Sequence, residues 1–146
     1  MKKTLPKAPT ILVKTREDWH RFAKRWRRYP PTQKFLAYKF GRTKGLTYES
    51  PLKKSTTPRL SYTLGGTMRV TDADTNTRNG CGRGVNVATR DWIERVPFWA
   101  PEDGAIFLVE FTARDIAAVP CFENGKFRLF RCRVVAKVSE RGVPVL

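Results

Sequence analysis

The segment CGRGVNVATRDWIERV at residues 81–96 combines a cysteine, two glycines and an arginine, which could form a phosphate-binding loop, a reactive thiol or a tight turn. The Walker motif would need a lysine that is missing, and the dinucleotide-binding fingerprint needs a strand before its glycines, where this chain has a polar stretch. A nucleophilic cysteine needs a nearby base, and His20 is the sole histidine. We therefore interpret Gly82 and Gly84 as backbone requirements of a sharp entry into a buried strand, with Cys81 as a small, partly buried filler.

Metal ligands are sparse in this sequence. The three cysteines, Cys81, Cys121 and Cys132, are odd in number and widely spaced, which argues against a disulfide framework and against structural zinc. Residues 71–80, TDADTNTRNG, superficially resemble a calcium loop, but Thr77 occupies the position of the required glycine and the final glutamate is missing. We therefore expect free thiols, no metal and no cofactor.

The formal net charge of +16 is concentrated in the first part of the chain. Residues 1–60 contain 17 Lys and Arg against three acidic residues, whereas residues 61–146 contain 12 against ten. Solubility alone would not need such asymmetry, but a basic face directed at a polyanion would. The charge therefore indicates a nucleic acid, a nucleoprotein complex or an acidic protein surface as the partner. No apolar run approaches the roughly 20 residues of a membrane span, so we expect no membrane association and a cytoplasmic location.

Residues 15–29, TREDWHRFAKRWRRY, predict a basic amphipathic helix. Thr15 is a candidate N-cap with Asp18 three residues later, and the pair Pro30-Pro31 would end the helix. Three aromatic residues recur at helical spacing and are expected to face the core: Trp19, Phe22 and Trp26. Five cations within eight residues fill other positions and would repel one another unless an anion lies nearby. This helix is therefore the best candidate for a nucleic-acid contact.

Cations elsewhere extend this candidate surface. Residues 41–59 are polar, basic and punctuated by Gly and Pro, which predicts a long loop or a loose hairpin whose hydroxyls and cations could hold phosphate oxygens. A solvated loop fits this stretch equally well. The candidate nucleic-acid-binding residues of the whole chain are Arg21, Lys24, Arg25, Arg27, Arg28, Lys53, Lys54, Arg59, Arg83, Arg128 and Arg131.

The pattern of elements predicts a single α+β domain over residues 1–146. It would consist of an extended N-terminal arm (1–14), the basic helix and a sheet-rich core (35–146) with a short second helix near 90–95. The sheet is expected to be curved and mainly antiparallel. It is expected to come from residues 35–40, 60–70, 84–88, 105–111 and 117–137, with residues 126–138 as its last strand.

Two dipeptides in the core are hairpin signals. Gly65-Gly66 separates two short strand-like runs, and Asn124-Gly125 predicts a type I′ turn between CFE and KFRLFRCRVVAKV. Three further aromatic residues are expected to close one edge of the core, or to stack on unpaired bases if exposed: Trp92, Phe98 and Trp99.

The C-terminal half follows a pattern known from other proteins. CGRGVNVAT is followed by a helix and then by IFLVEFTARDIAAVP and GKFRLFRCRVV. Over residues 80–138 this order resembles a module of largely uncharacterised phage proteins, the rIIB-like ones among them. That module has a Cys-Gly-x-Gly-apolar-x-Val stretch, an apolar strand, an Asp-apolar pair before Val-Pro and a Lys-x-Arg strand. The resemblance implies a phage-encoded protein and gives almost no information about its activity.

More distantly, GRGVNVA at residues 82–88 is similar to the Gly-x-Gly-Ile-Tyr-Phe-Ala segment of ADP-ribosyltransferases. That resemblance implies an ADP-ribosyltransferase-like fold, with Asn86 at the position of the tyrosine that stacks on nicotinamide and a first-strand position near Tyr38 or Lys39. The last strands offer no obvious catalytic glutamate, and their Lys and Arg would oppose an oxocarbenium-like transition state. We therefore expect no NAD turnover and at most weak nucleotide binding.

Two function classes follow, with a third behind them. The leading one is a non-catalytic basic protein, phage-encoded, that binds nucleic acid or associates with a nucleoprotein complex. RNA and DNA both fit as its target, as do host machinery and the phage genome. The second class is an enzyme that uses the turn at residues 81–88 on a nucleotide or nucleic acid. The third is an assembly protein that docks on an acidic protein surface.

Overall fold

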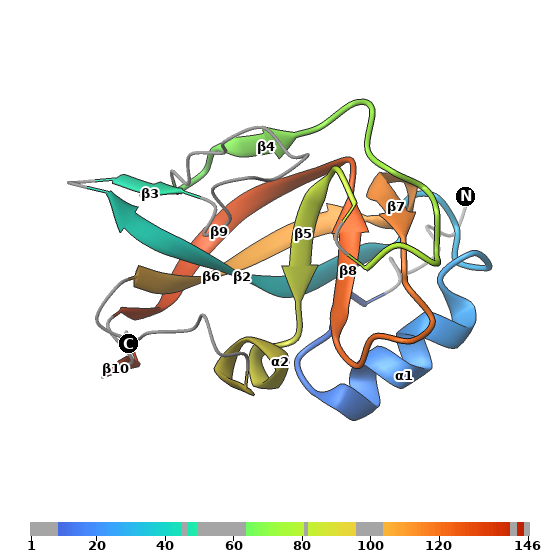
Figure 1. The fold of residues 1–146 in the computed structure, drawn as a ribbon, viewed down its shortest axis with the longest axis horizontal. Helices are drawn as coiled ribbons and strands as arrows, with labels where there is room; N and C mark the ends of the chain where they lie inside the picture. The colour runs from blue at the N-terminus through green and yellow to red at the C-terminus, as the bar shows by residue number, and fades with distance from the viewer. Residues whose placement is uncertain are drawn as a thin grey trace, which may run out of the picture.

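The computed structural model describes residues 9–44, 47–49, 64–80, 82–95, 104–140 and 143–144 of the chain. Within these residues ten strands form one sheet, and two α-helices lie next to each other below it in the view of Figure 1. The elements are, in chain order, β1 (Ile11–Leu12), α1 (Arg16–Arg25), β2 (Lys34–Lys44), β3 (Thr47–Glu49), β4 (Thr67–Arg69), β5 (Val85–Ala88), α2 (Arg90–Arg95), β6 (Gly104–Thr112), the 3-10 turn η2 (Ala113–Asp115), β7 (Ile116–Ala118), β8 (Lys126–Leu129), β9 (Arg131–Glu140) and β10 (Val143–Pro144).

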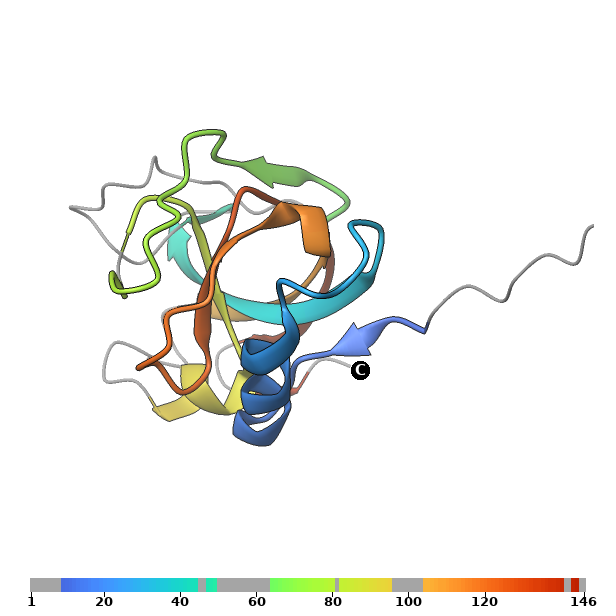
Figure 2. The ribbon, with the colours of Figure 1, turned by 90° about the vertical axis from the view of Figure 1, so that its right-hand side faces the viewer.

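Strands β2 and β6 form the centre of the sheet, paired antiparallel from Lys34 opposite Thr112 to Arg42 opposite Gly104. The strand order is β10-β9-β6-β2-β5-β8-β7, with β1 and β3 added to β2 and β4 added to β9. Among the described strands only β1 and β2 pair in parallel. Figure 2 shows how strongly the sheet curls. The predicted α+β class and the curved, mainly antiparallel sheet are therefore confirmed.

The main core lies on the sheet face that packs against α1. Side chains alternate between the two faces of a strand, so Phe35 on β2, Phe111 on β6 and Phe127 on β8 point to the same side. Phe22 of α1 fits among them, with its ring centre 4.9 Å from that of Phe127, and Phe35 stacks on Phe111 at 5.4 Å. These four aromatic rings are almost fully buried. The aromatic stripe of α1 is thus what holds that helix on the sheet.

A smaller apolar cluster lies on the opposite face of the sheet, beside α2. Tyr38 and Phe40 of β2 and Ile106 of β6 pack there with Ile93 of α2. Trp92 lies partly buried against this cluster, in line with its expected place at the edge of the core. Phe98 and Trp99, which were expected to join it, lie outside the described residues.

The predicted helix over residues 15–29 ends earlier in the structure, at Arg25. Residues 26–28 form a turn, tightened by a bond from the Arg28 N–H to the Arg25 carbonyl at 2.8 Å. A residue before proline is driven out of the α region, so Tyr29 cannot continue the helix into Pro30. The chain therefore unwinds one turn ahead of the proline rather than at it.

The predicted last strand over residues 126–138 is wrong as a single element. A bend at Phe130 separates β8, which pairs with β5 and β7, from β9, which pairs with β6 and β4. The Phe130 N–H donates to the Asp115 carbonyl, and its own carbonyl accepts from Val70, both at 2.7 Å. Because of this bend, two strands that are consecutive in the chain pair with different strands in two parts of the curled sheet.

The predicted type I′ hairpin at Asn124-Gly125 is also wrong. The segment CFE is not a strand, and β7 and β8 are joined by the longer connection 119–125. Gly125 has a φ of 147°, outside the type I′ range, and it lies against Thr89 and Trp92. The dipeptide therefore serves a close approach to α2 instead of a tight turn.

The other N-terminal and hairpin predictions fall partly outside the described residues. Of the extended arm 1–14, residues 1–8 are not described, and β1 within it joins the sheet beside β2. Residues 60–63 of the first Gly65-Gly66 strand are not described either, and the following β4 pairs with β9.

Candidate nucleic-acid interface

Helix α1 begins at the capping box that the sequence predicts. The Thr15 hydroxyl accepts from the Asp18 N–H at 3.2 Å, and the Asp18 carboxylate accepts from the Thr15 N–H at 2.9 Å. Although burial would raise it, hydrogen bonds from Thr15 and Lys14 lower the pKa of Asp18. The Arg16 N–H donates to the Asp91 carboxylate of α2 at 2.9 Å. The start of α1 is therefore fixed both locally and against the second helix.

The five cations predicted for this region are exposed and form what we name the α1 cationic cluster: Arg21, Lys24, Arg25, Arg27 and Arg28. Arg21 donates to the Asp18 carboxylate at 2.6 Å. Within the described part of the chain, the other four have no carboxylate within 4.0 Å. The Arg27 guanidinium lies over the Trp26 ring, 4.6 Å from its centre. The cluster is thus a group of exposed positive charges, most of which have no acidic partner among the described residues.

A groove of about 330 Å³ runs beside the cluster, and we name it the α1 groove. Its residues come from α1, the turn after it and two segments opposite: Trp19, His20, Ala23, Lys24, Trp26, Arg27, Thr77, Val119 and Cys121. No Asp or Glu is among them. The Trp19 indole is 2% exposed, and its buried Nε1 donor has no hydrogen-bond partner among the described residues. A buried donor without a partner is unfavourable, so this N–H costs the fold some stability.

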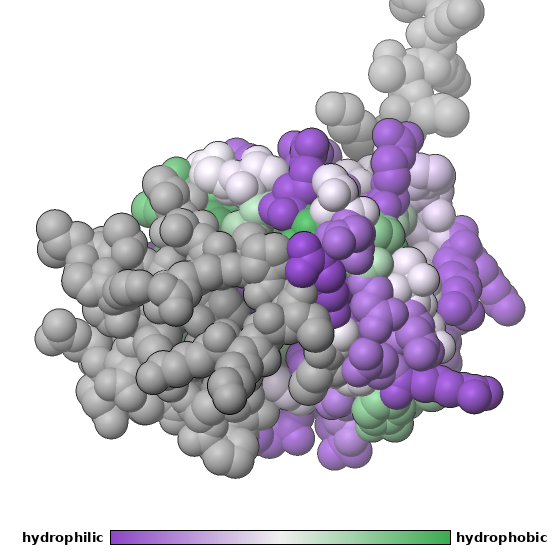
Figure 3. Space-filling view, turned by 45° about the horizontal axis from the view of Figure 1, so that its top comes forward, coloured by the Kyte–Doolittle hydropathy of each residue, from purple (hydrophilic) through white to green (hydrophobic). Residues whose placement is uncertain are grey.

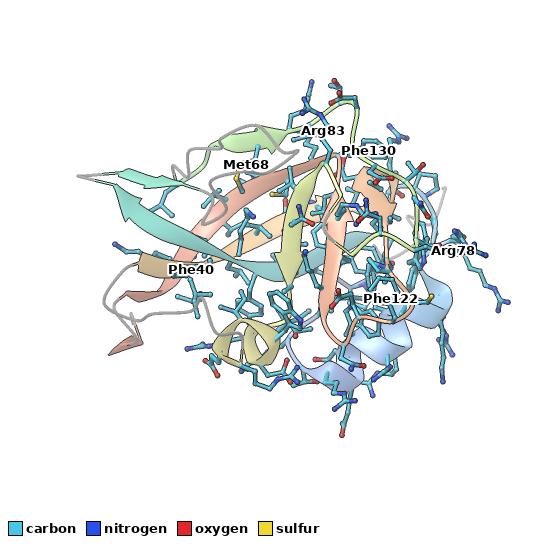
Figure 4. All side chains as sticks on the ribbon, viewed as in Figure 1. Phe40, Met68, Arg78, Arg83, Phe122 and Phe130 are labelled. Carbon is cyan, nitrogen blue, oxygen red and sulfur yellow. The ribbon has the colours of Figure 1, made fainter. Side chains whose placement is uncertain are left out.

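The loop at residues 71–80 supplies Thr77 to the groove and is organised from within. The Asp74 carboxylate accepts from the Asn76 N–H and from the Asn79 side-chain amide, each at 2.8 Å, and these bonds lower the pKa of Asp74. Figure 4 places Arg78 of this loop, and Phe122 of the 119–125 connection, on the side of the sheet where α1 lies. The described loop shows the turn-rich structure that its sequence predicts.

Arg128 of β8 holds this loop on the sheet. It is 0% exposed, and its guanidinium donates to three backbone carbonyls, those of Asp74 at 3.0 Å, Asn76 at 2.6 Å and Asn79. Arginine carries five donors in a planar fork, so one side chain can satisfy several carbonyls at once. Arg128 is therefore committed to positioning the loop, and we leave it out of the proposed interface.

The two glycines of the CGRG segment meet distinct requirements. Gly84 has a φ of 152°, a conformation that side-chain-bearing residues rarely adopt, directly before the buried strand β5. A Cβ on Gly82 would lie 2.6 Å from the Asp74 carboxylate and 3.0 Å from the guanidinium carbon of Arg128. The interpretation of both glycines as backbone requirements is therefore confirmed. Cys81 itself lies outside the described residues.

Two lysines and a thiol are buried near the middle of the sheet. The Lys39 ammonium donates to the Asn86 carbonyl at 2.5 Å, and the Lys126 ammonium donates to the Gly80 carbonyl at 2.6 Å. Burial lowers the pKa of Lys39 to about 8, and the neighbouring Lys126 charge acts in the same direction. Burial likewise raises the pKa of the Cys132 thiol to about 12. These groups belong to the interior and present no surface to a partner.

A second basic surface, which we name the β4–β9 ridge, consists of Arg69, Arg131 and Arg133. Arg69 is on β4, the strand at the top of Figure 1, and the two other arginines are at the start of β9. Arg69 lies directly opposite Arg131 in the antiparallel ladder, and both are exposed. Arg133 donates to Glu110 at 3.4 Å. Figure 3 looks down on this side, where hydrophilic side chains gather beside the residues drawn in grey. Like charges directly opposite each other destabilise a sheet. A negatively charged partner would therefore reduce the repulsion between Arg69 and Arg131.

The structure does not gather all the predicted contact residues into one place. Lys53, Lys54 and Arg59 lie outside the described residues. Arg83 is half exposed and donates to the Asp72 carboxylate at 2.8 Å, a hydrogen bond that lowers the pKa of Asp72. Arg131 lies on the ridge and is not part of the α1 cationic cluster. The candidate interface therefore consists of the cluster and the ridge.

Sequence reasoning missed Arg69 and Arg133, together with the far wall of the groove. In TMR at residues 67–69 a buried apolar residue precedes an outward arginine, and in RCR at residues 131–133 one lies between two outward arginines. This alternation could have identified the ridge. No comparable signal exists for Thr77, Val119 and Cys121. They come together only because the folded chain brings two distant segments to α1.

The residues of the distant ADP-ribosyltransferase resemblance do lie together. Tyr38 pairs with Ala88 across the β2–β5 ladder, and Asn86 pairs with Arg128 across β5–β8. The Asn86 side-chain amide donates to the carbonyls of Gly82 and Gly84 at 3.2 and 3.3 Å. A cation, not a carboxylate, therefore stands opposite Asn86 in the ladder. Both family resemblances stay predictions.

Neither helix of the described residues is long and apolar enough to cross a membrane. Comparison with protein-family models, with curated proteins and with solved structures found no match for this chain. The candidate interface therefore rests on the geometry and charge described above.

Proposed function

We propose that this protein binds nucleic acid, without catalysing a reaction on it, and that the α1 cationic cluster is the main contact. The observation that carries the proposal is the exposed, mostly uncompensated charge of Lys24, Arg25, Arg27 and Arg28. A solvated helix face usually mixes charges of both signs. A face of one sign gains free energy when phosphates replace its counterions.

The rigidity of the helix supports this use of its charges. Trp19 and Phe22 are buried against the sheet, and the capping box fixes the first turn. The backbone of α1 is therefore fixed before a partner arrives, so no entropy is lost in ordering it on binding. The β4–β9 ridge, where Arg69 and Arg131 face each other, offers a second contact to a long polyanion.

The composition of the α1 groove suits a nucleic acid. Trp26 and Arg27 offer an indole ring and a guanidinium plane, groups on which nucleobases stack.

The salt dependence of binding tests the proposal. We expect labelled mixed-sequence oligonucleotides, single-stranded and duplex, to bind at about 50 mM salt and to dissociate steeply as salt rises to about 200 mM. Replacing all five residues of the cluster with Gln should reduce the slope of log K against log salt by roughly three to four units, because each lost phosphate contact removes about 0.9 on duplex DNA.

A charge-matched pair of double variants is the control. Lys24→Gln with Arg25→Gln should reduce both affinity and slope, whereas Arg90→Gln with Arg95→Gln on α2 removes the same charge and should change them little. Absence of binding at about 50 mM salt, or equal losses in the two double variants, would contradict the proposal. Thermal melting of each variant confirms that the fold is retained.

A further inference from the structure

The α1 groove differs from the rest of the basic surface because it is lined by both apolar and polar groups. Ala23 and Val119 line it together with the almost fully buried Trp19. Lys24 and Arg27, both exposed, lie along it on the α1 side. This arrangement fits a ligand with a flat apolar body and a negative charge.

The dimensions of the groove restrict which ligand can enter. About 330 Å³ lies at the lower end of small-molecule sites, enough for one nucleobase with its sugar. The bases of a duplex are stacked and paired, so a duplex could reach the cluster with its phosphates but could not place a base in the groove. Only an unpaired nucleotide can occupy both parts.

The position of Arg27 adds a surface for stacking. Its guanidinium already covers the Trp26 ring at 4.6 Å. Bases stack on guanidinium planes as well as on aromatic rings, so a base can extend this layered pair. Its sugar-phosphate then lies beside Lys24, whose ammonium can neutralise the phosphate.

We propose that the α1 groove binds one unpaired nucleotide of a single-stranded nucleic acid. The base packs against the Arg27–Trp26 pair, and Lys24 and Arg27 contact the adjoining phosphates. This inference rests on the proposed function and deepens it, since it makes single strands the preferred substrate class.

Filling the groove is the first test. Ala23→Leu adds three carbon atoms inside it without removing a charge, and leucine is compatible with a helix. We expect this variant to bind 12-nucleotide oligo-dT and oligo-U about tenfold or more weakly, as loss of one stacked base implies. Its affinity for a mixed-sequence duplex should stay within about twofold, because phosphate contacts alone hold the duplex.

Two further variants locate the contacts. Lys24→Gln and Arg25→Gln remove the same charge from adjacent positions, but only Lys24 lines the groove, so Lys24→Gln should lose more single-strand affinity. Melting curves of each variant report on the fold.

The outcomes separate this inference from the proposed function. Equal binding of single strand and duplex, or an Ala23→Leu variant that binds oligo-dT and oligo-U normally, overturns the groove and leaves the cationic cluster as a non-selective contact. Absence of binding to either form overturns the proposed function itself. A preference for oligo-U over oligo-dT supports the groove and assigns it to RNA, and the reverse preference assigns it to DNA.

Discussion

The cations of this protein fall into two regions that use the same residue types in opposite ways. Those of the α1 cationic cluster are exposed, and most have no carboxylate nearby among the described residues. Lys39, Lys126 and Arg128 are buried, and each donates to backbone carbonyls far away in the chain. Surface cations cost the fold little and are available to a partner, whereas buried cations are costly unless hydrogen-bonded and so become part of the fold. The charge of a residue therefore indicates its role only when its burial is also known.

The largest expected effect is the loss of Arg128. Arg128→Met would leave the carbonyls of Asp74, Asn76 and Asn79 without their donor, and we expect the free energy of unfolding to fall by about 3 kcal/mol or more. Arg28→Gln in the cluster should change it by less than about 0.5 kcal/mol. Urea denaturation of both variants measures the contrast. A loss below about 1 kcal/mol in Arg128→Met would mean that the loop does not depend on this side chain.

The pH dependence of stability sharpens the description of the buried region. The pKa of Lys39 is lowered from 10.5 to about 8, so the unfolded state binds more protons between these values and stability rises with pH there. The pKa of Cys132 is raised from 9.0 to about 12, so the folded state binds more protons and stability falls over that range. The two effects oppose each other between about pH 9 and 10.5.

Removing either group should expose the effect of the other. Relative to the unaltered protein, Lys39→Met should lose the rise in stability above pH 8, and Cys132→Ala should lose the fall above pH 9. Over its full range each difference amounts to at most about 3 to 4 kcal/mol. Urea denaturation at pH 7 to 11 measures these differences, and titrations common to all three proteins cancel. Parallel curves for the three proteins would show that neither group titrates as its burial implies.

The smallest expected effect concerns the β4–β9 ridge, where exposed charges face each other. Arg131→Glu would replace a like-charge pair with an attractive one opposite Arg69, and should raise the free energy of unfolding by roughly 0.2 to 1 kcal/mol. The same change should weaken nucleic-acid binding if the ridge is a contact. Arg131→Gln, which removes the repulsion without adding attraction, should give an intermediate stability. Lower stability in Arg131→Glu would show that the two arginines do not interact.

Local sequence signals predicted the parts of the fold that local forces decide. Thr15 and Asp18 mark the start of α1, its aromatic spacing marks the buried face, and the positive φ of Gly84 matches the predicted sharp entry into β5. The bend at Phe130 was not predictable from local pattern, because it is set by hydrogen bonds to Asp115 and Val70 in distant segments.

The candidate site divides in the same way. The cationic cluster was predicted because its residues lie close together in the sequence, on α1 and in the turn that follows it. The groove was not, because Thr77 and Val119 are brought to α1 by the folding of the sheet. Arg128 was assigned to a nucleic-acid contact because an alternating strand does not show which face a loop will cover. Its three carbonyl partners lie about 50 residues earlier in the chain.

The long-range attachment of Arg128 has a consequence for the order of folding. Residues 127 and 129 point to the core and residue 128 to the loop, so a slip of β8 by one residue against β5 would turn the guanidinium away from the carbonyls it must reach. The loop at residues 71–80 can then acquire its final shape only after β5 and β8 have paired in the native register. Thr77 takes its place opposite α1 at that same late moment. A molecule with a mispaired sheet would keep its basic helix but lack the complete groove. During folding, the protein could therefore attract a polyanion before it could bind an unpaired nucleotide in the groove.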